Sequence, residues 1–301
     1  MTTAESLGGM GLFNAARAAG ISFQEEVLPE SKTATGDGLQ LHYLDWGNHH
    51  KPKLLLLHGG AQTAHSWDFF ALAMRSEYHI VALDQRGHGD SDWSDAGEYD
   101  TPFHTKDIDA VTDAIGFDQF HLVGLSMGGR NAYGFASAHP KKVKALVVVD
   151  VGPEIEKAGS NHIREFLQDT EIFESFDWLV DRVKRYNPLR PEEQIRGSLI
   201  NNLKKMDDGR WTWKHDRRRG IGQDRGGEFT KNAWADVAKI QCPTLIVRGE
   251  LSNIFAPATA QRMLDLIPNS RLVEVPNAGH LVQGDNPVEF EKVVRVFWDS
   301  L

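Results

Sequence analysis

The sequence predicts an α/β fold: a mostly parallel eight-stranded sheet with helices on both faces and a helical cap inserted after the sixth strand. Short apolar runs alternate with amphipathic segments along the chain, a rhythm typical of strand–helix–strand units. The run Lys53–His58 (KLLLLH) is continuous, as expected of a strand covered on both faces. The rhythm stops between 152 and 235, so we expect residues 1–151 and 236–301 to form the core and 152–235 the cap.

The eight expected strands begin with an antiparallel pair, because no helical segment separates the first two. They cover Ile21–Val27, Leu39–Trp46, Lys53–His58, Tyr78–Leu83, Gln119–Gly124, Val143–Val149, Thr244–Val247 and Arg271–Val275. The helices expected around them are Ser66–Arg75, Thr105–Ile115, Met127–Ala138, Pro257–Leu266 and Pro287–Trp298. No convincing buried strand is found in the cap, which we expect to be helical.

Composition excludes several classes of protein. The 301 residues are 41% hydrophobic and 25% charged, which is typical of a soluble globular chain. A net charge of −9 argues against nucleic acid or an anionic membrane as partner. The single cysteine, Cys242, excludes an internal disulfide and predicts a buried, inert thiol. No secretion signal or membrane span is evident, so we expect a cytoplasmic protein that acts on a small molecule.

The segment Gly124-Leu125-Ser126-Met127-Gly128 follows an apolar strand and precedes a helix-like segment. G-x-S-x-G in this context is typical of a nucleophile elbow, a sharp turn that the flanking glycines permit. The turn lifts the Ser126 hydroxyl out of the sheet, where a base can reach it. Ser126 is therefore the candidate nucleophile.

A serine hydroxyl needs an adjacent base, and His280 is the best candidate. It follows the last predicted strand, at the end of the sheet where open α/β folds place their sites. Acyl transfer also needs donors for the developing oxyanion. We expect these to be the backbone N–H of Met127, just after the nucleophile, and that of Gly60 in His58-Gly59-Gly60.

These motifs together resemble the α/β-hydrolase fold family. The resemblance rests on His58-Gly59-Gly60, Asp84-Gln85-Arg86-Gly87-His88-Gly89-Asp90-Ser91, Gly124-Leu125-Ser126-Met127-Gly128-Gly129 and Gly279-His280, which occur in family order. It implies that the Asp84–Ser91 segment is structural. It also implies a serine enzyme, since the family's haloalkane dehalogenases and epoxide hydrolases use an aspartate nucleophile.

The resemblance departs from the family at the third member of the triad. The family's acid usually follows the seventh strand, where this chain has Asn253. One interpretation moves the acid to Asp150, at the end of the sixth strand, as some relatives do. A second lets the Asn253 carbonyl orient the imidazole. A third makes the protein catalytically weak or inactivated, so that it binds a ligand instead.

Substrate contacts are expected from the cap and neighbouring loops. Trp67, after the oxyanion glycines, and Trp213, in the cap, are candidates for an apolar pocket wall. Arg217, in a run of three arginines, is a candidate partner for a substrate carboxylate. No His, Cys and Asp cluster has ligand spacing, so we expect no metal and no organic cofactor.

The sequence therefore predicts a serine hydrolase that cleaves a carboxylic ester, lactone or related acyl bond through an acyl-enzyme. Carbon–carbon bond hydrolysis by the same machinery stays open. The rival from another class is a ligand-binding protein on a hydrolase scaffold, which the residue at Asn253 favours.

Overall fold

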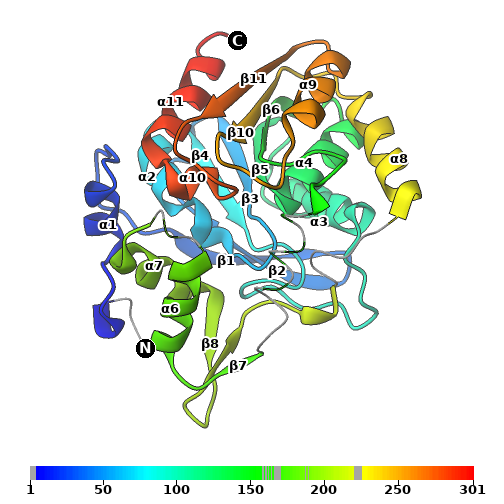
Figure 1. The fold of residues 1–301 in the computed structure, drawn as a ribbon. Helices are drawn as coiled ribbons and strands as arrows, with labels where there is room; N and C mark the ends of the chain where they lie inside the picture. Colours follow the sequence, from blue (N-terminus) through cyan, green and yellow to red (C-terminus); the bar gives the residue numbers. More distant parts are fainter. Residues whose placement is uncertain are drawn as a thin grey trace.

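An eight-stranded sheet organises the molecule (Figure 1). This computed structural model describes residues 5–157, 159, 161, 163, 165, 171–186, 188, 190–219 and 226–301. In spatial order the strands are β1 (Glu30–Gly36), β2 (Leu39–Asp45), β4 (His79–Leu83), β3 (Lys53–Leu57), β5 (Phe120–Leu125), β6 (Val143–Val149), β10 (Thr244–Gly249) and β11 (Ser270–Val275). β2 pairs antiparallel with β1 and β4, and the other neighbours are parallel.

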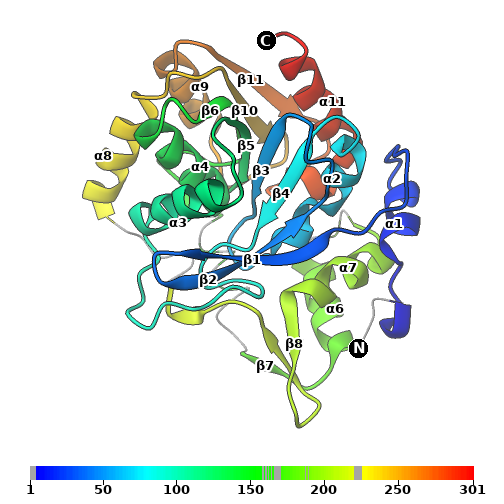
Figure 2. The same cartoon turned by 180° about the vertical axis from the view of Figure 1, so that it is seen from behind.

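Helices cover both faces of the sheet, as predicted (Figures 1 and 2). One face carries α2 (Asp68–Met74) and α11 (Pro287–Trp298), and the other carries α3 (Thr101–Ala114), α4 (Met127–Ala138), α8 (Gly226–Val237) and α9 (Pro257–Leu266). The burial of β3 on both faces explains why its sequence is continuously apolar. Leu54 and Leu56 enter one core while Leu55 and Leu57 enter the other, because successive side chains point to opposite faces.

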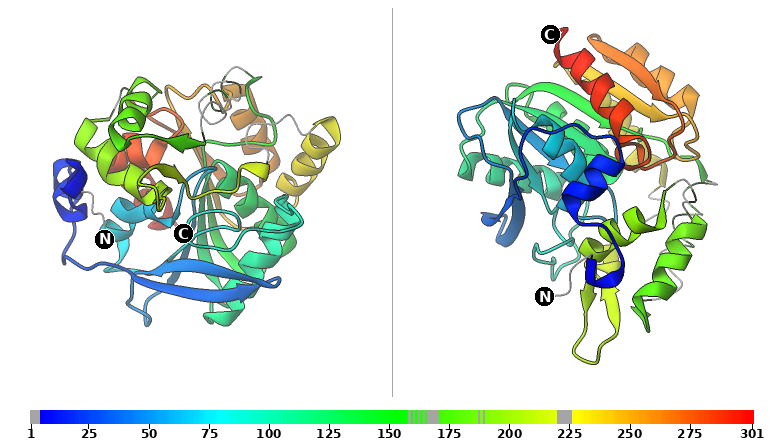
Figure 3. Two further views of the ribbon diagram at one scale, coloured as in Figure 1. Left: turned by 90° about the horizontal axis from the view of Figure 1, so that it is seen from below. Right: turned by 90° about the vertical axis from the view of Figure 1, so that its left-hand side faces the viewer.

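The segment predicted to form the cap lies across the end of the sheet where β5 and β6 finish (Figures 1 and 3). It contains α6 (Phe176–Tyr186), α7 (Glu192–Leu199) and a small antiparallel sheet in the order β7 (Ile172–Phe173), β9 (Trp211–Trp213), β8 (Leu203–Lys205). These elements pack around their own hydrophobic cluster. The expectation of a cap without strands was therefore wrong, because strands of two or three residues are too short to produce a periodic pattern.

The first strand was also misplaced. Ile21–Val27 forms no strand; Ile21 is buried in the core instead, and Glu25 pairs with Arg75 at 2.8 Å. β1 begins at Glu30 and turns into β2 through Asp37 and Gly38, both with positive φ. Asp-Gly between two strands is a hairpin signal that the sequence analysis overlooked.

The predicted return to the core at residue 236 falls inside α8. Ala233, Trp234 and Val237 of this helix belong to the core cluster that α4 and α9 share. The core therefore resumes with α8, and the preceding cap is shorter than expected.

A short helix near the N-terminus, α1 (Leu12–Ala18), contacts both the core and the cap. Ala15 and Ala16 are buried, and α1 packs against α2 of the core and α7 of the cap. Within the described part of the chain, no helix combines the length and apolar character that crossing a bilayer requires. Cys242 is buried, as predicted, and burial raises the pKa of its thiol to about 11.

The turn between β5 and α4 depends on the absence of a side chain at Gly128. A Cβ there would lie 2.3 Å from the Leu57 carbonyl oxygen and 2.5 Å from that of His58. This close approach seats the first turn of α4 directly against the end of β3. The loop that follows β3 and the residue that precedes α4 are thereby held side by side.

We predict that Gly128→Ala lowers the free energy of unfolding by about 2–3 kcal/mol, because strand and helix backbone must separate to admit a methyl group. Gly97→Ala is the matched control, since nothing lies within 4 Å of its Cβ position and only its φ of +71° is unfavourable. It should cost about 1 kcal/mol. Urea unfolding of both variants measures the difference; equal losses would contradict the close approach.

Candidate active site

Ser126 occupies a strained turn between β5 and α4. Its φ of 53° and ψ of −115° lie outside the regions that L-residues favour. Two backbone hydrogen bonds hold the residue in this conformation. Ser126 N–H donates to the Val149 carbonyl, and the Ser126 carbonyl accepts from Arg130 N–H, each at 2.9 Å. A backbone held in this way is typical of functional positions. The geometry matches the predicted elbow.

His280 meets the Ser126 hydroxyl from the loop between β11 and α10 (Val282–Asp285). Its Nε2 lies 2.9 Å from Ser126 Oγ, and its side chain is 14% exposed. The preceding residue, Gly279, donates its N–H to Asp285 Oδ2 at 3.0 Å. Asp285 also accepts from Arg190 of the cap at 3.1 Å, so this carboxylate fixes the histidine loop and ties it to the cap.

Asp150 completes the chain of hydrogen bonds. Its Oδ2 lies 2.7 Å from His280 Nδ1, and the side chain is fully buried. Because a carboxylate only accepts, we expect Nδ1 to carry the ring proton and Nε2 to be left to accept from the Ser126 hydroxyl. This is the tautomer that a general base for serine requires.

The carboxylate of Asp150 is held by two further donors. Gly249 N–H donates to Oδ1 at 3.0 Å, and Ser252 Oγ donates to Oδ2 at 2.6 Å. Ser252 Oγ accepts in turn from the N–H groups of Ile254 and Phe255. Sequence reasoning missed Ser252; its only signal was its place beside Asn253, at the usual acid position.

Asn253, at the usual position of the acid, lies outside this chain of hydrogen bonds. Among the described residues, the Nδ1 partner of His280 is Asp150, and no hydrogen bond joins His280 to Asn253. The loop that follows β10 therefore contributes Ser252 and the Gly249 N–H, which hold a carboxylate that comes from the neighbouring strand β6. Of the three interpretations left open by the sequence, the geometry favours Asp150.

The expected oxyanion donors lie in neighbouring segments. Met127 is the first residue of α4, and Gly60 lies in the turn after β3. Gln85 holds this turn to α4. It donates its N–H to His58 Nε2 at 3.0 Å and its side-chain amide to the His58 carbonyl at 2.7 Å, while its side-chain oxygen accepts from Asn131. Helix N-terminal N–H groups of this kind attract negative charge.

A second Ser–His–Asp chain occurs at the β1–β2 hairpin and provides an internal comparison. Ser31 Oγ lies 2.7 Å from His42 Nε2, and His42 Nδ1 lies 2.7 Å from Asp84 Oδ2. Burial raises the pKa of Asp84, but hydrogen bonds from His42 and from backbone N–H groups outweigh it and keep that pKa below its usual range. Ser31 lies in a regular strand, so, unlike Ser126, it is not directly followed by a helix.

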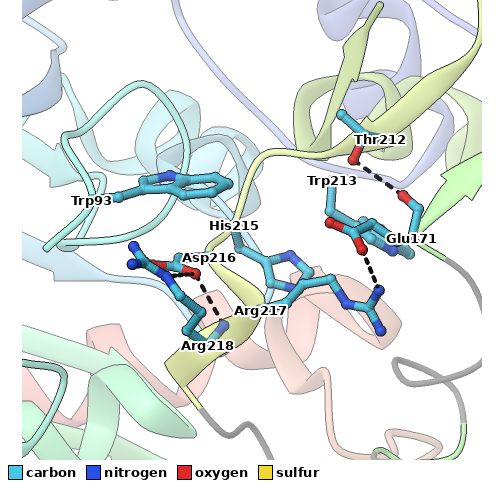
Figure 4. Close-up of a pocket in the computed structure, with 8 residues that line it drawn as sticks. All are labelled: Trp93, Glu171, Thr212, Trp213, His215, Asp216, Arg217 and Arg218. Atoms are coloured by element: carbon cyan, nitrogen blue, oxygen red, sulfur yellow. Dashed lines mark hydrogen bonds and ion pairs between the residues drawn. The ribbon is translucent and has the colours of Figure 1, made fainter. Parts of the chain in front are cut away.

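Two of the three predicted substrate contacts line one pocket of about 200 Å³ (Figure 4). Trp213 and Arg217 belong to it, together with Trp93, Glu171, Thr212, His215, Asp216 and Arg218. Arg217 pairs with Glu171 at 3.2 Å. Neither Ser126, Asp150 nor His280 lines this pocket, so contact of Trp213 and Arg217 with a substrate stays a prediction.

The prediction for Trp67 was wrong. Its indole is completely buried in the core, with ring centroids 6.1 Å from Phe70 and 6.0 Å from Phe290. It anchors the loop after β3 to the core and has no exposed area that a ligand could contact. Position in the sequence placed Trp67 near the oxyanion turn, but it could not distinguish a pocket wall from the core behind it.

The cap is attached to the core beside this pocket through Asp216. Its N–H donates to the Gly87 carbonyl at 2.8 Å, and its carboxylate accepts from the Tyr99 hydroxyl at 2.5 Å. Arg218 pairs with the same carboxylate at 2.6 Å. Burial, reinforced by the bond to Asp216, raises the pKa of Tyr99 to about 12. The phenol therefore stays protonated and keeps donating throughout the neutral range.

Comparisons with known proteins agree with the fold described above. A family model described as the alpha/beta hydrolase fold matches residues 52–287. The chain is 28% identical to the esterase Rv0045c of Mycobacterium tuberculosis over 264 residues, 85% of this chain and 86% of that one. It is 30% identical to the mouse sn-1-specific diacylglycerol lipase ABHD11 over 82% of this chain and 80% of the lipase. A solved structure of Rv0045c superposes with a TM-score of 0.78, and the match covers 99% of both chains.

We predict that Asp150→Asn slows the covalent labelling of Ser126 by a fluorophosphonate at least about a hundredfold, because the imidazole loses the partner that sets its tautomer. Asn253→Ala is the matched control and should label at the wild-type rate. The rates are followed by gel fluorescence or intact mass. Slow labelling of Asn253→Ala, with Asp150→Asn unaffected, would assign the orienting role to Asn253 instead.

Proposed function

Because the chain belongs to the α/β-hydrolase fold family, we propose that it is a serine hydrolase that cleaves a carboxylic ester, a lactone or a related acyl bond of a small molecule. One observation carries the proposal. Ser126, His280 and Asp150 form an unbroken chain of hydrogen bonds at 2.9 and 2.7 Å, on a strained turn with a helix N-terminus directly behind the serine.

Acylation follows from these positions. His280 Nε2 takes the hydroxyl proton as Ser126 Oγ attacks the substrate carbonyl carbon. The carbonyl electrons move onto oxygen, where the N–H groups of Met127 and Gly60 stabilise the charge. The imidazolium is stabilised by the buried Asp150 carboxylate. It then returns the proton to the leaving alcohol as the ester bond breaks, which leaves an acylated serine.

Deacylation repeats the sequence with water. His280 removes a proton from the water molecule, whose oxygen adds to the acyl carbon. Collapse of the second tetrahedral intermediate breaks the bond to Ser126 Oγ, and the proton held by His280 restores the hydroxyl. The products are a carboxylic acid and an alcohol, or a single hydroxy acid when the substrate is a lactone. No step requires a metal ion or an organic cofactor.

Three of the relatives support an acyl substrate. One is named an esterase and another a diacylglycerol lipase. A 3-hydroxybutyrate-oligomer hydrolase of Cupriavidus necator is 25% identical over 86% of this chain. All three names describe hydrolysis, and the first two describe it at esters. The substrate of this chain is a separate question, because cap and loops set specificity in this fold.

A ligand-binding protein without turnover was favoured by one residue, Asn253. If the acid is Asp150, Asn253 no longer favours such a protein, because the imidazole of His280 then has a carboxylate as its partner. The two functions give opposite results in a turnover assay, which is therefore the test of the proposal.

We predict that the protein hydrolyses a short-chain chromogenic ester and that Ser126→Ala lowers kcat at least about 10⁴-fold, since removal of a triad nucleophile has effects of this order or larger. Ser31→Ala is the matched control. It removes a hydroxyl with the same histidine and aspartate relationship but should leave kcat and KM unchanged. Initial rates measured by absorbance check both variants.

Two outcomes would overturn the proposal. The first is absence of ester turnover by the folded wild-type protein at high enzyme concentration, across short-chain esters and lactones. The second is turnover that survives Ser126→Ala, which would place the activity at another group.

A further inference from the structure

Three side chains with metal-ligating atoms converge where β2 ends and β4 begins. They are Asp45, His49 and His79, and their ligand atoms all lie within 4.8 Å of one another. His79 Nε2 is 3.1 Å from Asp45 Oδ1, and His49 Nε2 is 3.1 Å from Asp45 Oδ2. Both imidazoles thus direct the same ring nitrogen at one carboxylate.

Strand topology explains the convergence. Asp45 ends β2 and His79 begins β4, and these two strands run antiparallel as neighbours. His79 therefore lies at the amino end of the parallel strands, whereas Ser126 and Asp150 follow their carboxyl ends. Along the strand direction, the cluster and the candidate active site are separated by about 16 Å, the length of a five-residue strand.

Two of the three ligands are fixed in place. The side chains of Asp45 and His79 are each only 7% exposed. The His79 ring packs edge-on against Phe117, with centroids 4.9 Å apart and an interplanar angle of 77°. Gly47 N–H donates to Asp45 Oδ1 at 3.0 Å and fixes the carboxylate. Because these two side chains are already ordered, binding an ion would cost little conformational entropy at Asp45 and His79.

His49 supplies the third ligand from the solvent side. Its side chain is 64% exposed, and its ring meets His79 edge-on at 4.5 Å. The turn that carries it is closed by a hydrogen bond from Lys51 N–H to the Asn48 carbonyl at 2.9 Å. An ion can therefore enter from solvent and then be bound by the exposed imidazole of His49.

We propose that Asp45, His49 and His79 form a binding site for a divalent transition metal ion of the Zn²⁺ class. Two imidazole nitrogens and one carboxylate oxygen are a donor set that such ions take, with a water molecule in the fourth position. Donors at 2.0–2.2 Å around a tetrahedral ion lie about 3.3 Å apart. The present spacings reach this arrangement by a small movement of the exposed His49.

Lys32 is the competitor at this site. Its Nζ lies 2.7 Å from Asp45 Oδ2 and 2.8 Å from Glu30 Oε2. Lys32 Nζ, His79 Nε2 and the Gly47 N–H all contact this carboxylate. An incoming cation displaces the ammonium group, which Glu30 can retain.

The other cluster of ligand-type side chains in the described residues is less suited to an ion. It contains His42, Asp84 and Asp90, but both ring nitrogens of His42 already have partners in Ser31 and Asp84. Each cluster has two buried members and one exposed member. The difference lies in the histidines: an ion at His42 would have to displace Ser31 or Asp84 from the ring, whereas His49 and His79 each turn one nitrogen toward the shared carboxylate of Asp45.

The test is calorimetric titration of the full chain with Zn²⁺, with Mg²⁺ as the negative control. Wild-type protein should bind one Zn²⁺ at this site. His49→Ala should weaken binding at least about tenfold, the loss seen when even an outer partner of a ligand is removed. His50→Ala is the matched control, because this neighbouring exposed histidine lies outside the cluster. Its affinity should equal that of the wild type.

Two further variants separate this site from the active site and from simple surface binding. His280→Ala should retain the Zn²⁺ affinity, because its imidazole lies at the other end of the sheet. Lys32→Met should increase the affinity, since it removes the competing ammonium. The proposal is overturned if wild type binds no Zn²⁺, if His49→Ala binds like wild type, or if His280→Ala alone abolishes binding.

Discussion

The buried carboxylate of Asp150 is the group around which the active end of the sheet is arranged. It is fully buried, and its two oxygens accept from His280, Ser252 and the Gly249 N–H. These donors come from the loop after β11 and from the end of β10 and its following loop. A carboxylate buried without such partners would be very costly. The three segments are therefore held in one arrangement by a single carboxylate, and the imidazole is oriented as part of it.

Position, and not the identity of three residues, distinguishes the proposed triad. The same chain of Ser, His and Asp occurs at Ser31, His42 and Asp84 with equal or shorter distances. Ser126 differs in its strained backbone and in the helix that begins directly after it. Gly128 permits that helix to lie against the end of β3. This close backbone packing brings the start of α4 beside the turn after β3, the two segments from which the proposed oxyanion donors come.

Local patterns were sufficient to predict most of the sheet and the elbow. The helices Met127–Ala138, Pro257–Leu266 and Pro287–Trp298 were predicted residue for residue, because each has a strong apolar period and a proline or an elbow at its start. The fold class followed from the alternation of strands and helices. The prediction of a strand over Ile21–Val27 was wrong because Ile21 is apolar for a different reason. Its side chain fills the core beside α1 and α2.

The parts that could not be predicted depend on contacts between distant segments. Sequence order allowed Asp150 or Asn253 as the acid, and only the juxtaposition of β6, β10 and the histidine loop favours Asp150. Trp67 followed the oxyanion glycines, yet it packs against Phe290 near the other end of the chain. Asp45 and His49 are four residues apart, but the third member of their cluster, His79, comes from another strand. Spacing alone carries no signal for such a set.

The protonation state of the His280 ring tests the central claim most directly. Heteronuclear NMR of ¹⁵N-histidine-labelled protein distinguishes a proton on Nδ1 from one on Nε2, and His280→Ala identifies the signal among the 13 histidines. A neutral ring with its proton on Nδ1, shifted strongly downfield by the bond to Asp150, is the predicted result. A neutral ring with its proton on Nε2 would contradict the account, because that imidazole could not accept the Ser126 proton.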